Sequence, residues 1–156
     1  MTVRDSSPGP ADLRLEVDVD APAERTWAAV TDWDRQGEWM LGTSVRATGR
    51  DGRGVGGGLR AVTGVGRAGV VDTMVITEWD PPRIARVRHT GRLVRGTAAF
   101  EVRERGDAST FVWSETLDLP LGAAGRLGWR VLRPAVLWGL KLSLRRFAAF
   151  VTRPDH

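Results

Sequence analysis

The first forty residues change from alternating to helical spacing of their hydrophobic positions. Residues 13–20 read LRLEVDVD, in which leucine or valine alternates strictly with a charged residue. This pattern is typical of an antiparallel strand with one buried face. Residues 21–32 follow with Trp27 and Val30 three positions apart, which predicts a short amphipathic helix. A second short helix or turn is predicted over residues 33–39.

The middle of the chain carries strand signals only. It is rich in β-branched residues and alternating runs, and glycine or proline marks the turns between them. The predicted strands cover residues 43–49, 54–64, 69–80, 83–89, 94–107 and 109–119. Together with residues 13–20 they make seven strands, all suited to antiparallel pairing.

The last part of the chain changes period again. Residues 121–151 contain no acidic residue, and they predict one helix roughly 45 Å long. Pro134 is expected to kink or break this helix. At about 100° per residue, the basic side chains fall on one stripe, which consists of Arg126, Arg130, Arg133 and Lys141. The opposite stripe is apolar and includes Leu132 and Leu142, and Arg146 falls on this apolar side.

Length and composition exclude several function classes. A chain of 156 residues predicts one domain, over residues 12–152, after a flexible tail at residues 1–11. Cysteine and tyrosine are absent, so disulfides, thiolate nucleophiles and phenolic acids are excluded. The only histidines are His89 and His156, too few for a multi-histidine metal site. We therefore expect neither a metal ion nor a cofactor.

The charge and hydropathy of the chain limit its partners. A net charge of +4 is a weak sign of nucleic-acid binding, and we expect none. The chain begins without an apolar run and has no long uncharged apolar segment, which predicts a cytoplasmic protein. The basic stripe can make weak contact with anionic lipid headgroups, although a solvated outer helix face is the simpler explanation. A monomer and a homodimer both remain open.

Three stretches of the chain resemble a known family. They are VDAPAERTWAAVTDWDRQGEW at residues 19–39, GVGGGLRA at residues 54–61 and VITEWDPPRIARV at residues 75–87. They resemble the START and Bet v 1-like superfamily, and within it the bacterial polyketide cyclase/dehydrase and lipid-transport family often labelled SRPBCC. The resemblance covers about residues 12–151. It implies an α+β helix-grip fold, in which a curved seven-stranded antiparallel sheet wraps around the long C-terminal helix and two short helices follow the first strand.

A helix-grip fold leaves a cavity between the sheet and the long helix, and strand alternation predicts which side chains face it. The apolar residues predicted to contact a ligand are Trp33, Met74, Ile76, Val87, Ala98, Phe100, Trp113, Leu132 and Leu142. The polar residues predicted to point inward are Asp72, His89, Glu115 and Arg146. His89 can move protons near neutral pH. Asp72 or Glu115 can orient it or act as a base, and Arg146 can hold an enolate or carboxylate oxygen.

Three functions are open at this point. The resemblance implies that the chain binds a hydrophobic small molecule, such as an aromatic polyketide, a lipid or an isoprenoid. Alternatively, the chain is an enzyme, a polyketide cyclase or dehydratase that uses the inward acid and base residues. The third alternative is a membrane-associated accessory protein. The superfamily resemblance does not decide among them, because one fold hosts many functions.

Overall fold

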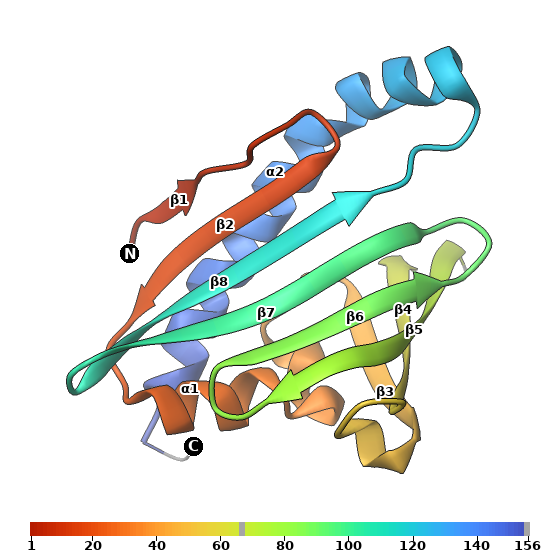
Figure 1. Cartoon of the computed structure of the whole chain (residues 1–156). Helices are drawn as coiled ribbons and strands as arrows, with labels where there is room; N and C mark the ends of the chain where they lie inside the picture. Colours follow the sequence, from red (N-terminus) through yellow and green to blue (C-terminus); the bar gives the residue numbers. More distant parts are fainter. Residues whose placement is uncertain (66–67, 155–156) are drawn as a thin grey trace.

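The fold is one antiparallel sheet with a long helix on one face (Figure 1). The computed structural model describes residues 1–65 and 68–154, so His156 lies outside the described residues. Within these ranges the strands are β1 (Val3–Asp5), β2 (Asp12–Val19), β3 (Thr43–Gly49), β4 (Gly58–Val65), β5 (Ala68–Asp80), β6 (Ile84–Thr90), β7 (Arg95–Arg105) and β8 (Ala108–Leu117). The helices are α1 (Ala23–Val30), η1 (Trp33–Glu38), η2 (Arg50–Gly52) and α2 (Gly122–Val151). The strand order is β1-β2-β8-β7-β6-β5-β4-β3.

The predicted α+β helix-grip architecture is confirmed, but the sheet has eight strands in the described chain where seven were predicted. The additional strand, β1, lies within the stretch that was predicted to be a flexible tail. It has only three residues, too few for an alternating pattern to be visible in the sequence. It pairs antiparallel with β2, and Arg4 Nη1 donates a hydrogen bond of 2.8 Å to Asp18 Oδ2.

The helices lie on the side of the sheet that becomes the core. α2 packs against β2, and α1 packs against β7 and β8. The buried residues of α2 all belong to its second half, at positions 143, 144, 147, 148, 150 and 151. The first turns of α2 extend beyond the ends of the strands (Figure 1). Pro134 was predicted to kink or break this helix; it lies inside one continuous helix, so the break is not found.

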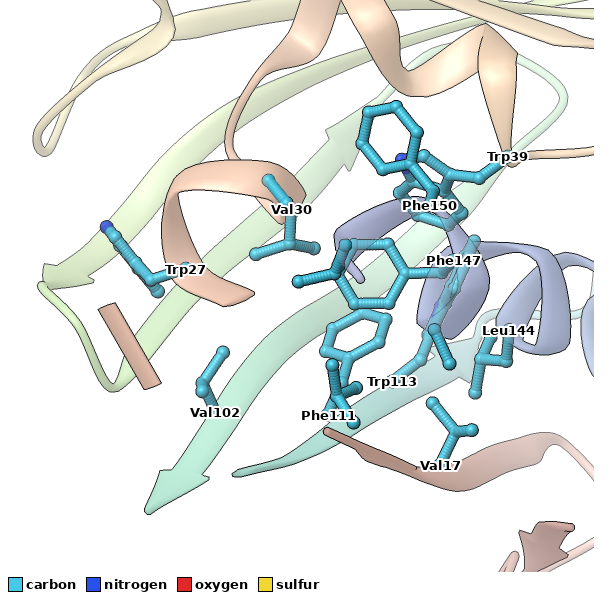
Figure 2. Close-up of a cluster of buried hydrophobic side chains, with 14 of the residues drawn as sticks. Val17, Trp27, Val30, Trp39, Val102, Phe111, Trp113, Leu144, Phe147 and Phe150 are labelled. Atoms are coloured by element: carbon cyan, nitrogen blue, oxygen red, sulfur yellow. The ribbon is translucent and has the colours of Figure 1, made fainter. Parts of the chain in front are cut away.

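The main core is aromatic. Phe147 of α2 lies between Trp39 and Phe111, with ring centroids 4.8 Å and 4.7 Å away (Figure 2). All three side chains are fully buried. Trp27 also packs in this cluster, so Trp27 and Trp39 both belong to the core. This core fixes the second half of α2 on the sheet and leaves the space beside its middle for a cavity.

A bulge in β5 reverses part of the predicted strand alternation. The pairing of β5 with β6 shifts between Ile76 and Glu78, so Glu78, which strict alternation would place on the same face as Ile76, is exposed. Its Oε2 accepts a hydrogen bond of 3.0 Å from Arg86 Nε. Trp79 takes the inward position and meets the ring of Trp27 edge-on at 5.2 Å. Bulges add one residue to a strand and cannot be read from alternation alone.

No helix in the described part of the chain combines the length and the hydropathy needed to cross a bilayer.

Candidate functional site

A cavity of about 430 Å³ lies between the sheet and the middle of α2. Its wall is largely apolar and is contributed by η1, by strands β3 to β8 and by α2. A second cluster of buried residues forms the sheet side of this wall, including Val45, Leu59 and Ala61. Phe100 and Trp79 pack against both this cluster and the aromatic core around Phe147, so the cavity wall is continuous with the core.

Most of the predicted apolar contacts lie at the cavity. Those that line it are Trp33, Met74, Val87, Ala98, Phe100 and Trp113. Ile76 is buried in the wall cluster but does not reach the cavity surface. Leu132 is 60% exposed and Leu142 does not line the cavity either, so the structure does not place these two where they were predicted.

The two misplaced leucines have a common physical cause. The helix projection assumed that one apolar stripe of α2 faces the sheet along the whole length of the helix. Instead, α2 presents Val136, Gly139, Leu140 and Ser143 to the cavity. Leu132 lies one turn before Val136, in the half of α2 that has no buried residue.

Three ionisable side chains meet in the cavity wall, and we call Asp72, His89 and Glu115 the polar cluster. His89 Nδ1 and Asp72 Oδ2 are 2.7 Å apart and share a hydrogen bond. His89 Nε2 lies 3.5 Å from Glu115 Oε1. The three residues come from β6, β5 and β8, and the intervening strand β7 carries Gly96 opposite His89 and Ala98 opposite Glu115. These two small residues leave room for His89 and Glu115 to approach each other over β7.

The environment of the polar cluster favours bound protons. Burial disfavours the charged imidazole of His89, but the hydrogen bond and charge of Asp72, with the charge of Glu115, outweigh it. The pKa of His89 is therefore raised above 6.5. Burial also raises the pKa of Glu115 above 4.5, and the charge of Asp72 adds to this, whereas His89 partly opposes it. The cluster thus holds protons that a surface carboxylate and histidine would have released.

Two atoms of the polar cluster are buried without a hydrogen-bond partner, namely Asp72 Oδ1 and His89 Nε2. Unpaired buried polar atoms are uncommon in folded proteins and cost free energy. A ligand hydroxyl group or a water molecule placed against them would satisfy them, because either can donate to Asp72 Oδ1 and can donate to or accept from His89 Nε2. The cluster can therefore orient a ligand by hydrogen bonds and can exchange protons with it.

Arg146 does not point into the cavity, contrary to the prediction. Its side chain is exposed, and its Nη2 donates a hydrogen bond of 3.4 Å to the backbone oxygen of Glu38. The buried face of α2 is set by Leu144, Phe147 and Val151, and Arg146 lies outside that face. A role in holding an enolate oxygen therefore has no geometric support.

The sequence interpretation missed Gln36 and Ser143, which both line the cavity. Gln36 Nε2 donates to the backbone oxygen of Val30 at 3.3 Å. Ser143 Oγ accepts a hydrogen bond of 3.0 Å from the backbone N–H of Leu41 and donates one of 2.9 Å to Gly139 O. Ser143 thereby ties α2 to the segment after η1. Its only signal in the sequence was a small polar residue within an apolar helical stretch.

The polar cluster leads to a testable prediction on acid–base behaviour. Asp72→Asn is expected to lower the pKa of His89. Burial lowers this pKa, and the negative charge of Asp72, which opposes the effect of burial, would be lost. Proton NMR titration measures this change directly, and His156→Gln identifies the signal of the second histidine. Asp107→Asn, in an exposed turn, is the matched control. An unchanged His89 pKa in Asp72→Asn would show that the contact is not formed in solution.

The contact between His89 and Asp72 makes the free energy of unfolding depend on pH. The folded-state pKa of His89 lies above its unfolded value of 6.5. The resulting stabilisation is fully present below pH 6.5 and is lost as the pH rises through the folded-state pKa. Urea unfolding of the wild type, measured as the pH rises through the folded-state pKa of His89, should show this decrease in the free energy of unfolding. The decrease should be smaller in Asp72→Asn.

Comparisons with known proteins identify relatives of the whole domain. A family model described as polyketide cyclase/dehydrase and lipid transport matches residues 10–152. TTHA0849 from Thermus thermophilus has a similar structure, with a TM-score of 0.75 and 18% identity over 90% of this chain and 96% of that one. A protein from Thermobifida fusca has a TM-score of 0.69 and 23% identity over 94% and 96% of the two chains.

A third similar structure is a two-domain protein. The di-domain ARO/CYC protein StfQ from the steffimycin biosynthetic pathway has a TM-score of 0.68 and 12% identity. The similarity covers 90% of this chain and 50% of StfQ. At these identities, the three structures establish the fold alone. Among curated proteins, no match to the chain was found.

Proposed function

Because the chain belongs to the polyketide cyclase/dehydrase and lipid transport family, we propose that it binds a hydrophobic small molecule in the cavity beside α2. The observation that carries the proposal is the apolar cavity of about 430 Å³ with one polar cluster in its wall. Ligand sites are typically clefts of about 300–1,000 Å³, mainly apolar, with a few placed polar groups. The family supports a role of this general kind, in hydrophobic ligand binding or polyketide cyclisation.

The cavity wall favours an aromatic polyketide over a lipid or an isoprenoid. Three of its large side chains are aromatic, namely Trp33, Phe100 and Trp113. Aromatic rings prefer offset or edge-on contacts with other flat rings. A fused-ring ligand would use these contacts, and one of its oxygens would reach Asp72 or His89. The structural similarity to StfQ, an ARO/CYC protein, is consistent with this choice.

Extraction of the purified protein with organic solvent, followed by mass spectrometry, tests the proposal. A stoichiometric apolar compound would support it and give the chemical class of the ligand. The matching assay in solution is titration with a panel of tetracyclic aromatics, fatty acids and isoprenoids, followed by fluorescence. Failure of every class to bind, together with an empty extract, would overturn the proposal.

Ala98→Phe is expected to block ligand binding. Ala98 lines the cavity on β7 and is 7% exposed, so a phenyl ring at this position would occupy space that the ligand needs. We expect at least a tenfold loss of affinity, since displaced apolar contacts contribute about 1.5–3 kcal/mol per large side chain. The control is Thr97→Phe, because the neighbouring residue Thr97 is exposed. Equal affinity in both variants would place the ligand elsewhere.

We propose as a second candidate that the chain is a cyclase or dehydratase acting on such a ligand. The specific observation in its favour is the polar cluster, in which a buried histidine contacts two carboxylates. Neutral His89 would remove a proton from a carbon beside a ligand carbonyl, and protonated Glu115 would supply a proton to an oxygen. Ring closure and loss of water both need such transfers. Neither the family nor its structures support the third sequence-based hypothesis, a membrane accessory protein.

A further inference from the structure

The cavity wall contains no permanently charged cation. Among the residues that the structure describes, no arginine or lysine lines the cavity, although the chain has 23 of them. Strand alternation explains this, because the arginines of the cavity strands point to the outer face of the sheet. Arg60 lies between two cavity residues, Leu59 and Ala61, and Arg88 directly precedes His89. Both arginines are exposed.

His89 is the one residue of the described cavity wall that can carry a positive charge, and this charge is already balanced. Its Nδ1 lies 2.7 Å from Asp72 Oδ2, and its Nε2 lies 3.5 Å from Glu115 Oε1. Asp72 is therefore the counter-ion of protonated His89. An anionic ligand would bring a further negative charge into the cavity, and a buried charge without a partner is strongly unfavourable.

Glu115 shows how this wall affects a carboxyl group. Burial raises the pKa of Glu115 and the charge of Asp72 adds to this, whereas His89 and Trp113 oppose it only in part. The ionised form of a carboxyl group is thus disfavoured even at 3.5 Å from the imidazole of His89. The carboxylate of a ligand would meet the same surroundings beside the polar cluster.

The unpaired atoms of the polar cluster require a hydrogen-bond donor. Asp72 Oδ1 is buried without a partner, and a carboxylate oxygen only accepts hydrogen bonds. The hydroxyl groups elsewhere in the wall differ, because they have partners within the protein. Thr43 Oγ1 lies 2.9 Å from Thr63 Oγ1, and Ser143 Oγ donates to a backbone oxygen at 2.9 Å. A ligand hydroxyl group could donate to Asp72, whereas a ligand carboxylate has no hydrogen to donate.

We propose that the polar cluster selects neutral ligands that carry a hydroxyl group and excludes carboxylates. This inference rests on the proposed function, since the ligand must occupy the cavity. It adds that Asp72 determines which functional group is accepted, while the aromatic side chains of the wall fit the ring system. Phenols would therefore bind, and free fatty acids and aromatic acids would be rejected. Specificity of this kind arises from unfavourable contacts with the wrong ligand as well as favourable contacts with the right one.

Four compounds with one ring system test the proposal on the full wild-type chain. They are naphthalene, 2-naphthol, 2-naphthamide and 2-naphthoate, with affinities measured by equilibrium dialysis at pH 7. We expect 2-naphthol to bind at least about tenfold more tightly than naphthalene, because its hydroxyl group reaches a charged acceptor. We expect 2-naphthoate to bind at least about a hundredfold more weakly than 2-naphthamide, which has the same shape without the charge.

The outcomes separate this inference from the proposed function. Equal affinities within either pair, naphthalene with 2-naphthol or 2-naphthamide with 2-naphthoate, would overturn the inference while ligand binding in the cavity stands. Failure of all four compounds to bind would contradict the proposed aromatic ligand and overturn the inference with it. Tighter binding of 2-naphthoate than of 2-naphthamide would show that the wall supplies a positive charge, contrary to the proposal.

Asp72→Leu tests whether Asp72 determines this selectivity. Leucine has a similar size but no acceptor atom, so the preference for 2-naphthol over naphthalene should disappear. The ratio of the two affinities is the readout, because naphthalene has no polar group and reports the apolar part of the cavity alone. Glu78→Leu is the matched control, since it removes an exposed carboxylate from the same strand. An unchanged ratio in Asp72→Leu, or an equal loss in Glu78→Leu, would overturn the role of Asp72.

Discussion

Replacing Phe147 by alanine is expected to lower the free energy of unfolding by about 3–5 kcal/mol. Phe147 is fully buried and is the residue of α2 that contacts both Trp39 and Phe111 (Figure 2). Its removal leaves a void between three elements that come from distant parts of the chain. The surrounding rings cannot close such a void without leaving their own contacts.

Trp138→Ala is the matched control on the same helix. The side chain of Trp138 is larger than that of Phe147, but it is 66% exposed, so its loss should change the free energy of unfolding by about 0.5 kcal/mol or less. Urea unfolding measures both variants. Since domains are stable by only about 5–15 kcal/mol, Phe147→Leu provides a milder variant that keeps a measurable folded state. Similar effects of Phe147→Ala and Trp138→Ala would contradict the placement of the core.

Alternation in the sequence was enough to predict most of the sheet. The strict pattern at residues 13–20 corresponds to β2, whose leucines and valines are all buried. Two features of the sheet, β1 and the bulge in β5, could not be predicted from alternation. β1 is too short to show a period, and its pairing with β2 depends on contacts distant in sequence. The bulge between Ile76 and Glu78 adds one residue to β5, and every later side chain of that strand changes face.

For the candidate site, strand alternation predicted the inward-facing polar residues, whereas the helical projection of α2 did not. Asp72, His89 and Glu115 were assigned inward from alternation, and the structure brings them together at 2.7 Å and 3.5 Å. On the same faces, Val87, two positions before His89, and Trp113, two positions before Glu115, are buried, which fixes the register of β6 and β8. The side-chain orientation of a helix is not fixed in this way where the helix extends past the sheet. Leu132 and Arg146 were misplaced because the rotation and overhang of α2 depend on where Phe147 packs.

The second candidate function gives the largest expected effect on chemistry. His89→Gln is expected to reduce the rate of proton removal from a carbon beside a ligand carbonyl by about 10²–10⁴-fold. Hydrogen–deuterium exchange of 1-tetralone, a two-ring aromatic ketone, measures this step in D₂O without knowledge of the natural substrate. Arg88→Gln, on the exposed side of the same strand, is the matched control and should exchange at the wild-type rate.

The pH profile then separates a base from a residue that merely shapes the cavity. Only neutral His89 can accept a proton, and its pKa is raised, so the exchange rate should increase as the pH rises through that value. Asp72→Asn lowers this pKa and should shift the rising limb to lower pH, while a purely structural change would lower the rate without moving the limb. Exchange no faster than in buffer, in a protein that binds the ketone, would leave ligand binding as the function and remove the enzyme hypothesis. Exchange that persists in His89→Gln would assign the base to another group, with Glu115, 3.5 Å from the imidazole, as the first to test.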